Sequence, residues 1–87
     1  MKIKMINKAG QCRQGILDKV SVQDIEKILG PSNVQDDPDK VKYSWGFEVD
    51  GVECGIWDYK GSHLYDYFSF FGPSSVFEKL FPGKVSG

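Results

Sequence analysis

Two apolar runs between residues 41 and 60 dominate the pattern of hydrophobic and polar positions, and they flank the dipeptide Asp50-Gly51. Asp-Gly readily adopts the two positive φ angles of a type I′ turn, so this stretch predicts a β-hairpin with a two-residue loop. The loop length fixes the strand register, which gives the hairpin one mostly apolar face. We expect the core side chains of this face to be Trp45, Phe47, Val49, Val52, Cys54 and Ile56.

The other face of the hairpin combines large aromatic residues with a position that has no side chains. The same register places Gly46 opposite Gly55, close to Trp57. Two facing glycines could let a ligand approach the backbone, or they could lie under the N-terminal segment or a second subunit. The register also places Glu48 opposite Glu53, where like charges repel unless a cation meets them.

Shorter patterns before the hairpin predict an edge strand, a second short segment and a helix. Residues 1–6 alternate apolar side chains with lysines, which is typical of a strand guarded by charge at the edge of a sheet. Residues 16–20 form the second segment. Ser21 and Asp24 then form a capping box, after which apolar residues recur at helical spacing until Gly30-Pro31 ends the helix.

A third strand of the antiparallel meander is predicted at residues 64–71, after a short turn. We assign Phe68 and Phe70 to its core face, although one bulge would invert the assignment. Tyr65 and Tyr67 then lie on the outer face of the sheet, beside the aromatic residues of the hairpin.

A second helix follows this strand, with Pro73 leading in and Ser75 and Glu78 as its predicted capping box. Together these elements predict an α+β fold, in which an antiparallel sheet of three to four strands is built on the central β-hairpin and two short helices pack on one face. A chain of 87 residues has the length of a single domain, and we expect residues 83–87 to be a flexible tail.

Composition narrows the classes of partner. Eleven basic and twelve acidic residues leave a formal net charge of -1, which argues against a nucleic-acid polymer. The sequence shows no signal peptide and no apolar run long enough to cross a membrane, so we expect a cytoplasmic protein with free thiols. A disulfide between Cys12 and Cys54 is the alternative.

Motifs for catalysis are absent from the sequence. It has no P-loop, dinucleotide-binding fingerprint, HExxH or CxxC, so we expect no cofactor and a protein that is not an enzyme. Asp58, His63 and Asp66 could converge after the hairpin to bind a metal or act as acid and base. The favoured alternative is that Asp58 accepts hydrogen bonds from the turn at residues 61–63. The acidic residues 36–39 lack the pattern of a calcium loop and predict a solvated loop.

The outer aromatic face is the strongest candidate for a binding site. Aromatic rings can stack on a planar ligand, and ammonium groups at the margin can meet a phosphate. The predicted ligand-binding residues are Trp57, Tyr59, Lys42, Lys60, Tyr65 and Tyr67.

The second half of the chain also shows a family resemblance. The segments that carry it are Trp45-Gly46-Phe47, Asp50-Gly51, Ile56-Trp57-Asp58-Tyr59-Lys60-Gly61 and Phe71-Gly72-Pro73. They resemble small, mostly uncharacterised proteins of tailed bacteriophages that carry a hairpin ending in aromatic-Asp-aromatic-Lys. The resemblance covers residues 41–81 and implies a viral protein, made in the host bacterial cytoplasm, that antagonises host defence by binding.

These observations lead to one main hypothesis and two alternatives. The main hypothesis is a non-catalytic binding protein, forming a homo-oligomer, that sequesters a small phosphorylated planar ligand such as a cyclic-nucleotide-like immune signal. The first alternative is an inhibitor that binds a host protein through the same aromatic face. The second is a small nucleotide hydrolase that uses Asp58, His63 and Asp66.

Overall fold

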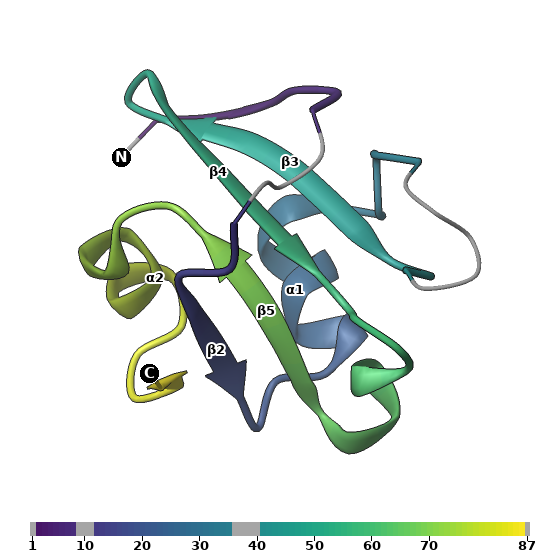
Figure 1. The fold of residues 1–87 in the computed structure, drawn as a ribbon. Coiled ribbons are helices and arrows are strands. Elements are labelled where there is room, and N and C mark those ends of the chain that lie inside the picture. Colours follow the sequence, from purple (N-terminus) through teal and green to yellow (C-terminus); the bar gives the residue numbers. More distant parts are fainter. Residues whose placement is uncertain (1, 9–11, 36–40, 87) are drawn as a thin grey trace.

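A computed structural model describes residues 2–8, 12–35 and 41–86 of the chain, and its fold is α+β. Within these residues one antiparallel sheet of six strands runs in the order β1-β3-β4-β5-β2-β6, so the predicted three to four strands are too few (Figure 1). The elements are β1 (Ile3–Met5), β2 (Gly15–Asp18), α1 (Val22–Leu29), β3 (Ser44–Val49), β4 (Val52–Trp57), the 3-10 helix η1 (Ser62–Tyr65), β5 (Tyr67–Phe71), α2 (Ser74–Leu80) and β6 (Val85–Ser86).

The central hairpin of β3 and β4 has the predicted register. Val49 pairs with Val52 next to the turn, and Asp50 and Gly51 both have positive φ angles, of 52° and 85°. This conformation is the one that Asp-Gly favours, so the local sequence determines how the two strands align. The strands end near residues 44 and 57, and one further backbone bond joins Asp58 N–H to the carbonyl of Tyr43 (3.1 Å).

The core lies on one face of the sheet, where the hairpin contributes most of the side chains predicted for it. Trp45, Phe47 and Ile56 are fully buried, and Val49 and Cys54 are 3% exposed. Val52 is the exception. Its side chain is 46% exposed, although its cross-strand partner Val49 is only 3% exposed.

Both helices contribute to this same core, as expected. Ile25 and Leu29 of α1 and Phe77 of α2 belong to one cluster with the buried strand residues, and Figure 1 shows α1 behind the sheet. The ring of Phe77 stacks on Phe70 with centroids 4.2 Å apart. Trp45 also donates from Nε1 to the carbonyl oxygen of Gly30 (2.9 Å), so this buried indole has the polar partner that it needs.

Three short strands complete the sheet. The edge strand predicted at residues 1–6 is β1, which pairs with β3, and the segment predicted at residues 16–20 corresponds to β2, which pairs with β5. The final strand, β6, pairs with β2 at Leu17 and Val85, where the sequence predicted a flexible tail. A strand of two residues carries too little periodicity to be read from a sequence.

The predicted strand at residues 64–71 is too long at its start. Leu64 and Tyr65 lie in η1, Asp66 has a left-handed φ of 58°, and β5 begins at Tyr67. Beyond this point the face assignment is correct, since Phe68 is fully buried and lies in β5. Tyr65 therefore does not lie on the outer face of the sheet.

The helix caps divide into one correct and one wrong prediction. Ser21 Oγ accepts from Asp24 N–H (3.2 Å) while Asp24 Oδ2 accepts from Ser21 N–H (3.0 Å), which is the predicted capping box of α1. At α2 the N-cap is Pro73, no side chain caps the helix, and Ser75 already lies inside it. Proline at this position brings the helical φ but no side-chain acceptor.

Candidate functional site

The glycine notch on the outer face is filled by the protein's own backbone. A Cβ built on Gly46 would lie 2.4 Å from the carbonyl oxygen of Lys8 and 2.6 Å from that of Ile6. Ile6 N–H also donates to the carbonyl of Gly46 (2.9 Å). Position 46 therefore needs a glycine, because the backbone of the N-terminal segment approaches it closely. This is the alternative in which the N-terminal segment covers the face, and it leaves no space for a ligand above Gly46.

Asn33 fixes this crossing, and sequence reasoning missed it. Its Nδ2 donates to the carbonyls of Ile6 (2.9 Å) and Gly46 (3.1 Å), and its Oδ1 accepts from Gly46 N–H (3.0 Å). Because an Asn side chain offers both donors and an acceptor, it can add hydrogen bonds to both backbone segments at the point where they meet. An isolated Asn after a Gly-Pro helix stop predicts only a turn, so no sequence pattern indicates this role.

The facing pair of glutamates on the hairpin meets a cation from the same chain. Lys8 Nζ lies 2.8 Å and 3.0 Å from the two carboxylate oxygens of Glu53. Both side chains are nearly half exposed, so the ion pair relieves the repulsion from Glu48 and adds little more to stability.

An open hollow lies on the outer face where β4 ends. Its volume is about 340 Å³, and its lining residues are Arg13, Trp57, Tyr59 and Ser69; we call it the aromatic hollow. Trp57 pairs with Ser69 across β4 and β5, which places the half-buried indole over a buried serine. Arg13 comes from the segment before β2, far away in sequence, and no local pattern could have predicted it.

A larger hollow lies at the other end of the hairpin. It has a volume of about 450 Å³ and is lined by Lys2, Ile3, Lys4, Glu48, Asp50 and Gly51. None of these residues is aromatic, and the group contains acids as well as lysines. This hollow offers no ring on which a planar ligand could stack.

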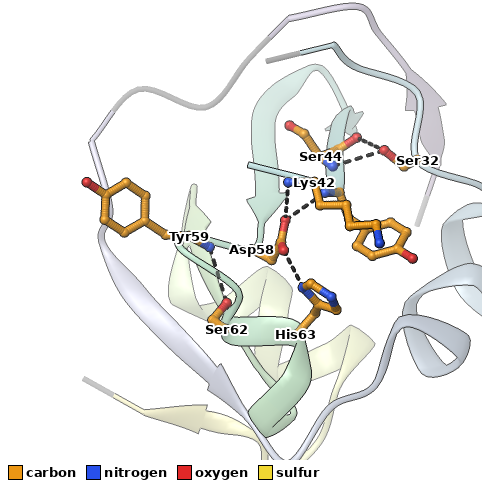
Figure 2. Close-up of polar contacts among 8 residues, drawn as sticks. Ser32, Lys42, Ser44, Asp58, Tyr59, Ser62 and His63 are labelled. Carbon is orange, nitrogen blue, oxygen red and sulfur yellow. Dashed lines mark hydrogen bonds and ion pairs between the residues drawn. The ribbon is translucent and has the colours of Figure 1, made fainter. Parts of the chain in front are cut away.

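The structure brings together only part of the predicted site. Lys60 Nζ lies over the ring of Tyr59, 5.3 Å from its centroid, at the margin of the aromatic hollow. Lys42 Nζ instead lies 5.8 Å from the ring centroid of Tyr43, and Figure 2 shows the side chains of Lys42 and Tyr59 pointing in opposite directions. Tyr65 and Tyr67 are exposed but do not line the hollow.

Between Trp57 and Tyr59, the side chain of Asp58 is fully buried on the opposite side of the strand. Its Oδ1 accepts from the backbone N–H groups of Lys42 (2.8 Å) and Tyr43 (2.6 Å), and its Oδ2 pairs with His63 Nδ1 (Figure 2). A buried carboxylate without donors would be very costly, and these three contacts supply them.

The expected contact between Asp58 and the following turn is therefore present, in the form of the His63 side chain. The imidazole also packs edge-on against Tyr43, with centroids 5.1 Å apart. Asp66 stays outside this arrangement, since its side chain is exposed. In the part of the chain that the structure describes, no group of three His, Cys, Asp or Glu residues could hold a metal ion. The acidic residues 36–39 lie outside the described residues.

Both cysteines are free thiols in different surroundings. Cys12 is exposed and Cys54 is buried in the core. Burial raises the pKa of the Cys54 thiol to about 11, so this side chain is neutral near pH 7. A neutral thiol is a poor nucleophile, which agrees with the assignment of Cys54 to packing.

Comparisons with protein-family models, with curated proteins and with solved structures found no match. The two helices that the structure describes are also too short and too polar to cross a membrane. The fold and the site define a small α+β domain with an aromatic hollow on the outer face of its sheet.

Proposed function

We propose that this protein is a non-catalytic binding protein that captures a small phosphorylated planar ligand, such as a cyclic nucleotide, in the aromatic hollow. The observation that carries the proposal is the convergence of Trp57, Tyr59 and Arg13 around one open space of about 340 Å³. The resemblance to tailed-bacteriophage proteins supplies the biological setting. In that setting the protein sequesters a nucleotide immune signal in the host bacterial cytoplasm.

Each lining residue has a distinct chemical use in this proposal. The rings of Trp57 and Tyr59 provide stacking surfaces, which contribute about 1–3 kcal/mol per nucleobase in other proteins. The guanidinium of Arg13 can bind a phosphate through two parallel N–H bonds, which a lysine cannot do. Arg13 thus takes the role that the sequence assigned to Lys42, while Lys60 remains at the margin near Tyr59.

The size and polarity of the aromatic hollow favour a small ligand over a polymer. Its volume lies at the lower end of the range for small-molecule sites, about 300–1,000 Å³. A nucleic-acid polymer would need a basic track, whereas the net charge of the chain is -1.

The geometry also favours binding over hydrolysis. Both carboxylate oxygens of Asp58 are already engaged by donors from the protein, and His63 does not belong to the lining of the hollow. Cys54 lies in the core as a neutral thiol. A general base for attack on a bound ligand would have to touch that ligand or reach it through one water, and these groups do not line its site.

Calorimetric titration with a panel of cyclic mononucleotides and cyclic dinucleotides tests the proposal. We expect one class to bind wild-type protein, and we expect Trp57→Ala and Arg13→Gln each to weaken that binding by about tenfold or more. Tyr65→Ala and Lys42→Gln are matched controls, because both residues are exposed and lie outside the hollow; they should leave affinity unchanged. Retained binding in Trp57→Ala would refute the site, and failure of the whole panel would refute the ligand class.

A second candidate function is inhibition of a host protein, and one observation favours it. Leu64 and Tyr65 of η1 are 74% and 76% exposed, which is unusual for large apolar side chains on a small domain. The same surface could join copies of this chain in a homo-oligomer. Sedimentation of wild-type protein and of a Leu64→Ser, Tyr65→Ser double variant separates these cases from ligand binding. If wild-type protein is a dimer and the double variant is a monomer, η1 mediates self-association. If wild-type protein is a monomer that retains a stoichiometric host protein, and the double variant does not retain it, the inhibitor is favoured.

A further inference from the structure

The residue between the two aromatic walls of the hollow faces the other way. Successive side chains of an extended strand point to opposite faces, so Trp57 and Tyr59 flank an Asp58 side chain that enters the interior. The carboxylate is fully buried. It stands where β4 ends and where the chain turns into η1.

The donors to this carboxylate come from two separate parts of the chain. Lys42 N–H (2.8 Å) and Tyr43 N–H (2.6 Å) belong to the segment that enters β3, whereas His63 belongs to η1. Asp58 therefore ties the start of the hairpin to the turn that follows it. Charge-assisted hydrogen bonds of this kind are stronger than neutral ones, which makes the end of β4 a well-defined point in the fold.

The same turn also holds Tyr59 from its other side. Tyr59 N–H donates to Ser62 Oγ (3.2 Å), and Ser62 is 1% exposed (Figure 2). Lys60 and Gly61 both have positive φ angles, of 53° and 80°, so the chain reverses directly after Tyr59. The backbone of this wall residue is thus fixed by Asp58 before it and by Ser62 after it.

We propose that Asp58 and His63 are positioning residues of the aromatic hollow, which hold the Tyr59 wall in place beside Trp57 without touching the ligand. This inference rests on the proposed function for its biological meaning, but its structural content can be measured without any ligand. His63 acts through a hydrogen bond from Nδ1 to Asp58, and the bond keeps η1 closed against the end of β4. When that bond is lost, the turn that carries Ser62 loosens and Tyr59 loses its fixed place.

Two substitutions at His63 separate the hydrogen bond from simple packing. In His63→Asn the side-chain amide nitrogen can occupy nearly the position of Nδ1 and still donate to Asp58. His63→Leu keeps a comparable volume but removes the donor, which leaves one oxygen of a buried carboxylate without its partner. If His63 is a positioning residue, His63→Asn should keep the hydrogen bond to Asp58 and the wild-type behaviour of Tyr59, and His63→Leu should lose both.

The first readout uses nitrogen-15 spectra and amide exchange of the protein without ligand. In His63→Leu we expect the Trp57 indole signal to shift and the Tyr59 amide to exchange about tenfold faster or more. Amides of α1, such as that of Ile25, should keep their wild-type protection. In His63→Asn both hollow signals should remain close to wild type. An unmoved indole and a protected Tyr59 amide in His63→Leu would overturn the inference, as would equal damage in both variants.

The second readout is the affinity for cyclic GMP and for cyclic di-GMP, measured by calorimetry. If either binds, His63→Leu should weaken its binding by about tenfold, while His63→Asn should stay within about threefold of wild type. If neither probe binds wild-type protein, the proposed ligand class fails for these probes, and the exchange data still decide the positioning role. If His63→Leu does not fold, Ser62→Ala replaces it, because that change removes only the acceptor of Tyr59 N–H. The Tyr59 amide should then exchange faster than in wild-type protein, and full protection of this amide would refute the inference.

Discussion

Adding one methyl group at Gly46 tests directly how the outer face is covered. In Gly46→Ala the new Cβ would lie 2.4 Å from the carbonyl oxygen of Lys8 and 2.6 Å from that of Ile6. Both obstacles are backbone atoms, so no side-chain rotation relieves the contact. The φ angle of Gly46 is not positive, and the whole effect is therefore steric.

The size of the effect follows from what has to move. Ordinary contact needs about 1 Å more space than the structure offers, so the N-terminal segment must shift away from β3. That shift breaks the bond from Ile6 N–H to the Gly46 carbonyl and the bond from Asn33 Nδ2 to the Ile6 carbonyl, both 2.9 Å long. Two lost hydrogen bonds and the remaining overpacking together cost about 2–4 kcal/mol. The total free energy of unfolding of a domain of this length is about 4–13 kcal/mol, so the expected loss is a large part of it.

Urea denaturation followed by circular dichroism measures this loss as a lower midpoint with an unchanged slope. Gly83→Ala is the control, because its φ of 76° strains an alanine although nothing lies within 4 Å of the added Cβ. That control should lose only about 1 kcal/mol. The Ile6 amide should also exchange faster in Gly46→Ala. Stability within about 0.5 kcal/mol of wild type, with Ile6 still protected, would refute the proposed cover.

Three further predictions concern the core thiol, the cap of α1 and the serine pair of half-buried Ser32 and buried Ser44. Burial raises the pKa of Cys54 from 9.0 to about 11, so only Cys12 should react with a thiol reagent in the native state, and early labelling of Cys54 would contradict this. The contribution of the neutral Cys54 thiol to the free energy of unfolding should be complete below pH 9 and should be lost as the pH rises towards 11. The hydrogen bond from Ser21 N–H lowers the pKa of Asp24 below its usual 3.8 in the folded protein. The stabilisation from this cap should therefore be complete above pH 3.8 and should be lost as the pH falls through the folded-state pKa of Asp24. Melting curves measured against pH should show this loss, and Asp24→Asn should remove it. Ser32→Ala loses two hydrogen bonds to the Ser44 backbone and should cost about 1–3 kcal/mol in urea, whereas Ser44→Ala removes a buried hydroxyl that has no partner among the described residues and should be neutral or stabilising; the reverse order would sink the argument.

The parts of the fold that could be predicted from the sequence are those fixed by near neighbours. Asp50-Gly51 determines the turn, the turn determines the register, and the register determines which hairpin residues enter the core. The capping box of Ser21 and Asp24 is local in the same way. In each case the physical cause lies within a few residues of its effect.

The parts that the sequence could not predict depend on distant segments. Leu64 and Tyr65 continue the alternation of a strand, but they lie in η1, where His63 contacts Asp58 and the left-handed Asp66 ends the helix. Arg13 reaches the aromatic hollow only because the β2 segment is inserted next to β5. The position of Arg13 follows from the order of strands in the sheet, and a local sequence pattern does not encode that order.

The facing glycines show how a correct register can still leave a site undecided. The pairing of Gly46 with Gly55 was predicted correctly, and both open access for a ligand and cover by the N-terminal segment were compatible with it. The carbonyls of Ile6 and Lys8 now occupy the space above Gly46. This removes the notch as a binding position and moves the candidate site along β4, to the end of the strand.

At that end, one short segment combines two opposite requirements. Trp57 and Tyr59 remain accessible on the outer face, although aromatic residues gain most by burial. Asp58 is fully buried between them, although a carboxylate loses most by burial. The donors that the protein supplies to Asp58 offset this cost, and the alternation of side chains along the strand places the neighbouring rings on the outer face. A segment that buries a carboxylate on three hydrogen-bond donors and leaves a half-buried Trp57 and an exposed Tyr59 on the outer face is more consistent with recognition than with packing, and for this reason we propose the aromatic hollow as the site of function.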